Sequence, residues 1–152
     1  MSTHGDEQPG PGAVRPPTDL ADREAIRELY ARYCFFVDVG RPDLFALAFT
    51  EDGVLWLSDR GSYRGRDEIE AHVGRRTGKT LHLIHNVAID SVEDDVAYAH
   101  AYFQLISPED ALCLAYGTYD DALRRVGGAW CWHRKKVNYM FRTPAYAEIA
   151  AT

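Results

Sequence analysis

The feature that most constrains the fold is a run of four long strand-like segments in the second half of the chain. Each is about twice as long as a usual strand. Short turns separate them, and the last is Gly127-Gly128, a pair typical of a two-residue hairpin. Strands this long must twist and curl, so they predict a curved antiparallel sheet. The segments are 79–91, 95–107, 111–126 and 129–142.

Helical patterns come before these strands. Apolar residues recur at spacings of three and four after Thr18, a suitable N-cap, and Gly40 ends that long helix. Two shorter helices are expected at 41–53, with Phe49 in its apolar content, and at 66–76. A short hairpin turns at Asp59-Arg60-Gly61 between them. Helices followed by antiparallel strands predict an α+β fold. We expect a cone-shaped roll, in which a curved mixed or antiparallel sheet wraps around three helices and leaves a ligand cavity.

Length and composition predict the domain boundaries and argue against nucleic-acid-binding and membrane-spanning proteins. A length of 152 residues predicts a single domain, expected at 18–144 and followed by a C-terminal tail at 145–152. Residues 1–17 hold four of the seven prolines and few large apolar groups, which predicts a disordered arm. The net charge of −6 disfavours nucleic-acid binding, and no apolar run is long enough to span a membrane. Three widely spaced cysteines and the lack of a signal-like start indicate reduced thiols in the cytoplasm.

Several local motifs occur in an order that resembles a known family. The first helix and its exit carry Tyr33-Cys-Phe-Phe-Val-Asp38, and Phe49-Thr-Glu-Asp-Gly53 precedes the hairpin. Later come His82-Leu-Ile-His85-Asn86 and Gly117-Thr-Tyr119-Asp-Asp121. The chain resembles the SnoaL-like group of the nuclear-transport-factor-2-like (NTF2-like) superfamily, which includes scytalone dehydratase and bile-acid 7α-dehydratase. The resemblance implies a cofactor-independent enzyme acting on a hydrophobic small molecule, and a homodimer formed through the sheet.

The same resemblance implies an active site. Asp38 and His82 match the aspartate and histidine that act together in these dehydratases, and Tyr33 matches a nearby tyrosine. A histidine can take a proton and return it, and a carboxylate on its other nitrogen fixes its tautomer. Tyr33 or Tyr30 can donate to a developing enolate oxygen. Without the resemblance, His82 can equally be a core histidine and Asp38 a helix-exit residue.

His85 competes with His82 for the inward position. In a regular strand the two point to opposite faces, and the face of His85 is the more apolar. Periodicity therefore favours His85, the resemblance favours His82, and a β-bulge between them would turn both inward. The remaining candidates for substrate contact are Tyr30, Phe49, Trp56 and Tyr119. No third ligand stands at a convincing spacing from the two histidines, so no metal is expected.

Two further expectations concern the strands. If Gly127-Gly128 forms a two-residue loop, Asp121 lies opposite Arg134, which predicts a cross-strand ion pair. The run Arg134-Lys135-Lys136 alternates across the sheet and is expected to be at least partly solvated. His100 shares a polar and aromatic face with Tyr98 and Tyr102, which favours a subunit interface. A dehydratase or isomerase is the leading function; a polyketide cyclase with the same base, or a non-catalytic binding or assembly module, is the alternative.

Overall fold

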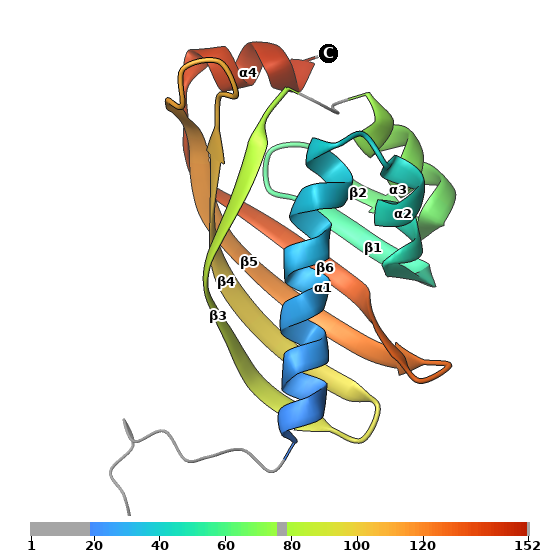
Figure 1. The fold of residues 1–152 in the computed structure, drawn as a ribbon. Helices are drawn as coiled ribbons and strands as arrows, with labels where there is room; N and C mark the ends of the chain where they lie inside the picture. The colour runs from blue at the N-terminus through green and yellow to red at the C-terminus, as the bar shows by residue number, and fades with distance from the viewer. Residues whose placement is uncertain (1–18, 76–78, 152) are drawn as a thin grey trace, which may run out of the picture.

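The computed structural model describes residues 19–75 and 79–151 and confirms the α+β fold (Figure 1). The first half contains helices α1 (Leu20–Asp38), α2 (Pro42–Leu47) and α3 (Gly65–Gly74) with strands β1 (Phe49–Leu57) and β2 (Gly61–Arg64). The second half contains β3 (Leu81–Glu93), β4 (Val96–Ile106), β5 (Cys113–Val126) and β6 (Ala129–Arg142), and the short helix α4 (Pro144–Ala151).

The strands form one curved sheet in the order β2-β1-β6-β5-β4-β3. Neighbouring strands are antiparallel, except that β1 runs parallel to β6. The predicted hairpin at Gly127-Gly128 is confirmed: Val126 pairs with Ala129, and both glycines have positive φ (57° and 82°), as a two-residue turn of this kind requires.

Helix α1 lies across the concave face of this sheet, as Figure 1 shows. It buries one stripe, Ile26, Tyr30, Tyr33 and Val37, at spacings of four, three and four residues. The stripe packs into a core that includes Trp132 and Leu123 from the sheet. Because Asp38 is the last residue of α1, the buried stripe delivers it to the end of the sheet where β3 begins.

Several element boundaries differ from the sequence prediction. Helix α2 ends at Leu47, and Phe49, which was expected in that helix, is instead the first residue of β1. Most of the expected C-terminal tail, 145–152, lies in helix α4. Thr143 and Pro144 start this helix, and the Thr143 hydroxyl accepts a hydrogen bond from the Tyr146 backbone N–H at 3.2 Å. The expected arm at 1–17 and the N-cap at Thr18 lie outside the described residues.

Among the irregularities in the sheet, one β-bulge on β3 and one on β6 bear on predictions of which side chains point inward. On β3, Asn86 and Val87 stand opposite Ala101 alone, and Asn86 takes a positive φ of 50°. On β6, His133 is the extra residue between the pairs Leu123–Trp132 and Ala122–Arg134.

The bulge on β6 overturns one prediction. It shifts the register by one residue, so Asp121 pairs with Lys135 instead of Arg134. The basic run was expected to be at least partly solvated: Arg134 is exposed and Lys136 is half-buried, whereas Lys135 is completely buried.

The outer face of the sheet carries the polar and aromatic residues of β4. Tyr98, His100 and Tyr102 are exposed there, and the alternating Ala97, Ala99 and Ala101 are buried. His100 contacts Asp90 across the surface at 3.0 Å. The homodimer expected through this face and the cytoplasmic location stay predictions. Within the ranges that the structure describes, no helix has both the length and the apolar character needed to cross a membrane.

Candidate active site

Asp38 and His82 meet where the end of α1 crosses the start of β3. One carboxylate oxygen, Oδ1, lies 2.7 Å from His82 Nδ1, and the other, Oδ2, accepts the His82 backbone N–H at 3.0 Å. Both side chains are largely buried, with 11% of His82 and 14% of Asp38 exposed. The carboxylate thus holds the same residue at two points, which fixes the orientation of the imidazole.

The side of the His82 ring away from Asp38 lines a cavity and contacts an aromatic ring. The Tyr33 ring stands edge-on to the imidazole, with the centroids 5.6 Å apart at 90°. No protein group in the described ranges forms a hydrogen bond with the second ring nitrogen, Nε2. His82 lines an interior cavity on one side and a groove between α1 and β3 on the other. The ring therefore has one nitrogen held by Asp38 and one available to a ligand.

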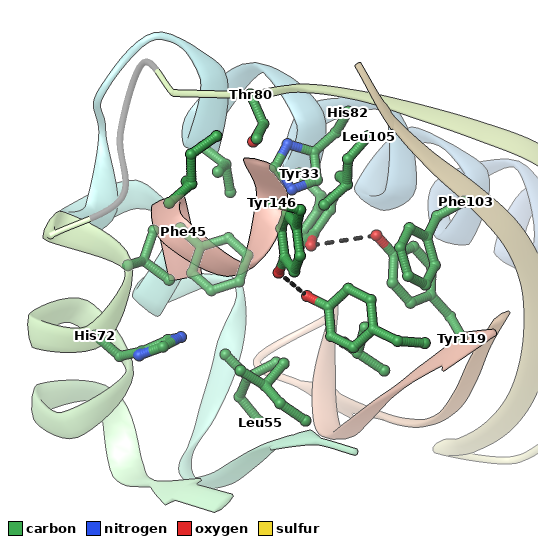
Figure 2. Close-up of a pocket in the computed structure, with 16 residues that line it drawn as sticks. Tyr33, Phe45, Leu55, His72, Thr80, His82, Phe103, Leu105, Tyr119 and Tyr146 are labelled. Carbon is green, nitrogen blue, oxygen red and sulfur yellow. Dashed lines mark hydrogen bonds between the residues drawn. The ribbon is translucent and has the colours of Figure 1, made fainter. Parts of the chain in front are cut away.

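The interior cavity has a volume of about 70 Å³. Figure 2 shows His82 and Thr80 at one end, Leu55 at the other, and His72 across from Phe103 and Tyr119. Apolar side chains make up most of its wall, and tyrosine hydroxyls, Thr80 and two histidines supply the polar groups. The lining residues are Tyr33, Val37, Phe45, Leu55, Leu57, His72, Val73, Thr80, His82, Phe103, Leu105, Tyr119, Val137, Tyr139, Tyr146 and Ile149.

Of the remaining sequence candidates, Tyr33 and Tyr119 line the cavity. Their hydroxyl oxygens lie 3.4 Å apart, and burial raises the pKa of both phenols, so they stay protonated. The Tyr119 ring also stacks on Phe103, with centroids 4.6 Å apart. These tyrosines give the wall beside His82 two hydrogen-bonding groups.

The other candidates do not line the cavity. Tyr30 is buried behind it and donates to Asp121 at 2.5 Å. Phe49 is in the core against Phe45 and Trp132. Trp56 lines a hollow on the outside of the sheet. His85 is exposed and lines only the groove between α1 and β3.

A buried ion pair lies behind the Tyr33 and Tyr119 rings. Lys135 Nζ is 2.8 Å from Asp121 Oδ2, and both side chains are fully buried. Four aromatic rings surround the ammonium, and Tyr119 is the nearest, with its centroid 3.6 Å from Nζ. Burial raises the pKa of Asp121 and lowers that of Lys135, and each charge opposes the shift of the other. The ion pair therefore packs behind the aromatic residues of the cavity wall but does not itself line the cavity.

Sequence reasoning missed four polar residues of the cavity: His72, Thr80, Tyr139 and Tyr146. His72 on α3 is buried and its ring stacks on Tyr63, with centroids 3.9 Å apart. Thr143-Pro144 is a sequence pattern typical of a helix start, and it could have placed Tyr146 on a C-terminal helix. Among the residues that the structure describes, no three histidine, cysteine or acidic side chains converge on a possible metal position.

Fold and site together define a cone-shaped α+β domain with a histidine–aspartate pair in an interior cavity. The model of the SnoaL-like domain family matches residues 18–136, and the chain belongs to this family. No curated protein matches the sequence.

Solved structures of low sequence identity share the fold. A candidate scytalone dehydratase from Novosphingobium aromaticivorans has a TM-score of 0.72 and 24% identity, with 83% of this chain and 89% of that chain covered. An NTF2-like protein with a cystatin-like fold from the same organism has a TM-score of 0.72 and 22% identity over 86% and 89%. LinA has a TM-score of 0.71 and 20% identity over 82% and 90%.

Proposed function

We propose that the protein is a cofactor-independent dehydratase or isomerase in which His82 is the general base and acid. The observation that carries this proposal is the 2.7 Å contact between His82 Nδ1 and Asp38 in the wall of a mostly apolar cavity. The fold shared with a candidate scytalone dehydratase supports it. The expected substrate is a hydrophobic cyclic or polyketide-like molecule with a carbonyl group.

The reaction uses one nitrogen of one ring. His82 Nε2 removes the proton next to the carbonyl, and the electron pair moves toward the carbonyl oxygen. Asp38 stabilises the imidazolium that forms and keeps Nδ1 as the protonated nitrogen. The C–O bond at the next carbon then breaks, and the departing hydroxide takes the proton from Nε2 to leave as water. Return of the proton to a different carbon gives isomerisation instead.

The cavity is too small to hold a ring-sized substrate without a change in its wall. Its volume of about 70 Å³ is smaller than the cavity of about 150 Å³ that accommodates benzene in another protein. Tyr146 and Ile149 of α4 close one part of the wall. A ring-sized substrate therefore requires side chains of the cavity wall to move outward.

The test is a panel of small cyclic β-hydroxyketones, followed by the absorbance of the enone that elimination produces. We expect turnover by the wild-type protein and a loss of about 10²–10⁴-fold in His82→Ala and in Asp38→Asn. His85→Ala is the matched control, since it removes an exposed histidine from the same strand, and it should keep the wild-type rate. Equal rates in His82→Ala and the wild type would refute the proposed role of His82.

The small cavity specifically favours one alternative, a non-catalytic binding module. In that case the protein would bind apolar ligands with equal affinity in the wild type and in His82→Ala, and no member of the panel would be converted. A polyketide cyclase would use the same base, and product analysis by mass spectrometry separates it from a dehydratase, because cyclisation without loss of water leaves the mass unchanged.

A further inference from the structure

A second pair of tyrosines lines the cavity, contributed by the last strand and the last helix. The Tyr146 hydroxyl on α4 donates a hydrogen bond of 2.6 Å to the Tyr139 hydroxyl on β6 (Figure 2). Tyr146 is 2% exposed, and both residues belong to the cavity wall. The proposed reaction of His82 does not use this pair.

An arginine lies directly behind the pair. Arg60, in the turn between β1 and β2, donates from Nη2 to the Tyr146 hydroxyl at 2.8 Å. Its guanidinium carbon lies 5.7 Å from the Tyr146 ring centroid and 6.0 Å from that of Tyr139. Asp59 anchors Arg60 through Nη2 at 2.7 Å and also contacts Arg142 at 3.1 Å. Two arginines against one carboxylate leave a net positive charge beside the tyrosines.

The hydrogen bonds have a defined direction. A guanidinium can only donate, so Tyr146 accepts from Arg60, and its own hydroxyl proton is donated to Tyr139. No protein group in the described ranges accepts the remaining proton, that of the Tyr139 hydroxyl. Each bond polarises the next, so the positive charge makes the last proton a stronger donor. The Tyr33–Tyr119 pair differs, because no cation among the described residues donates a hydrogen bond to either of its hydroxyls.

We propose that the Tyr139 hydroxyl, polarised by Arg60 through Tyr146, binds the carbonyl oxygen of the substrate and holds the negative charge that develops on it. This inference rests on the proposed function, because an enolate oxygen forms only if His82 removes the adjacent proton. It assigns the donor to the carbonyl oxygen as Tyr139, in place of Tyr30 or Tyr33, the donors considered from the sequence. Arg60 and Tyr146 are positioning residues; Tyr139 is the group that touches the substrate.

The test uses 4-nitrophenolate, whose ring oxygen imitates an enolate, and nitrobenzene, which has the ring without that oxygen. We expect Tyr139→Phe to bind 4-nitrophenolate about 10- to 100-fold more weakly and nitrobenzene as the wild type does. Arg60→Gln should weaken phenolate binding by at least about threefold, and Arg60→Lys should restore part of it. Arg142→Gln removes the second cation, whose guanidinium carbon lies 5.8 Å from the Tyr139 ring centroid, but leaves the hydrogen bonds from Arg60 through Tyr146 in place, and it should weaken phenolate binding less than Arg60→Gln does.

The inference would be overturned by a lack of saturable phenolate binding in the wild type, or by equal phenolate binding in the wild type and Tyr139→Phe. Parallel loss of phenolate and nitrobenzene binding in Tyr139→Phe would also overturn it, since that pattern indicates a damaged cavity. His82→Ala keeps the two proposals apart. Phenolate binding should survive in that variant. The elimination reaction can therefore fail while the carbonyl-binding site holds, and the carbonyl-binding site can fail while elimination is observed.

Discussion

Replacing Lys135 by methionine removes the positive charge behind the cavity wall. Methionine keeps most of the volume of the lysine side chain but leaves Asp121 as an uncompensated buried acid, which costs about 3–5 kcal/mol in proteins. Asp121 retains hydrogen bonds from the Tyr30 hydroxyl at 2.5 Å and the Lys136 backbone at 3.2 Å. Contacts between the ammonium and four rings are lost as well. We expect the free energy of unfolding to fall by about 4 kcal/mol near neutral pH.

The loss should depend on pH in a predictable direction. Burial raises the pKa of Asp121, and Lys135 is the main group opposing that shift. Without Lys135, the folded variant holds this proton to a higher pH than the unfolded chain, in which the reference pKa is 3.8. The folded state then binds more protons, so stability falls as the pH rises above that value, by up to about 1.4 kcal/mol per pH unit. The fall stops once Asp121 ionises in the folded state.

Urea unfolding followed by circular dichroism, from about pH 4 to about pH 8, measures the free energy of unfolding of the wild type, Lys135→Met and a double variant. The difference between the wild type and Lys135→Met should grow with pH. The double variant Asp121→Asn/Lys135→Met lacks the acid, so its difference from the wild type should stay nearly constant and be smaller at the high end. A Lys135→Met variant within about 1 kcal/mol of the wild type at about pH 8 would refute the reasoning.

Three other predictions follow from single features. Gly117→Ala should destabilise the protein by about 3 kcal/mol or more in urea unfolding, because the new Cβ would lie 1.9 Å from the Asn138 carbonyl oxygen; wild-type stability would contradict this. Ile149→Ala should enlarge the cavity and tighten binding of indole measured by calorimetry, and weaker binding would argue against an α4 wall. Burial, helped by Asp38, raises the pKa of the Cys34 thiol to about 11, so its alkylation, followed by peptide mass spectrometry, should speed up about tenfold per pH unit below that value; a plateau near neutral pH would contradict it.

Local patterns predicted most of the fold. The long strands, the Gly127-Gly128 hairpin and the helix carrying Tyr33 were all visible as spacing and turn chemistry. Asp38 and His82 were selected by resemblance to a family, and the structure brings them within hydrogen-bonding distance. These features survive because each depends on residues close in sequence or on a motif order that the fold fixes.

Two of the errors, the choice of the inward histidine on β3 and the partner of Asp121 on β6, trace to bulges that a period of two cannot reveal. On β3, His82 and Ile84 face inward before the bulge at Asn86, and Val87 and Ile89 face inward after it. A regular strand would group Val87 and Ile89 with His85, which is why periodicity favoured the wrong histidine.

Because of the second bulge, on β6, the sequence pattern did not predict the position of the buried Lys135. Trp130 and Trp132 face inward before His133, and Lys135 and Val137 face inward after it. One inserted residue thus places Lys135, instead of Arg134, opposite Asp121 and in the core. The position of such an insertion is set by packing across the sheet, so one strand's sequence does not determine it.

The most direct test of the central claim is the protonation of the His82 ring, measured by long-range proton–nitrogen NMR on uniformly labelled protein. We predict that the neutral imidazole carries its proton on Nδ1, toward Asp38, and leaves Nε2 unprotonated and able to accept a substrate proton. Asp38→Asn should abolish this preference. A His82 ring protonated on Nε2 in the wild-type protein would contradict the account, because the base would then have no free nitrogen in the cavity.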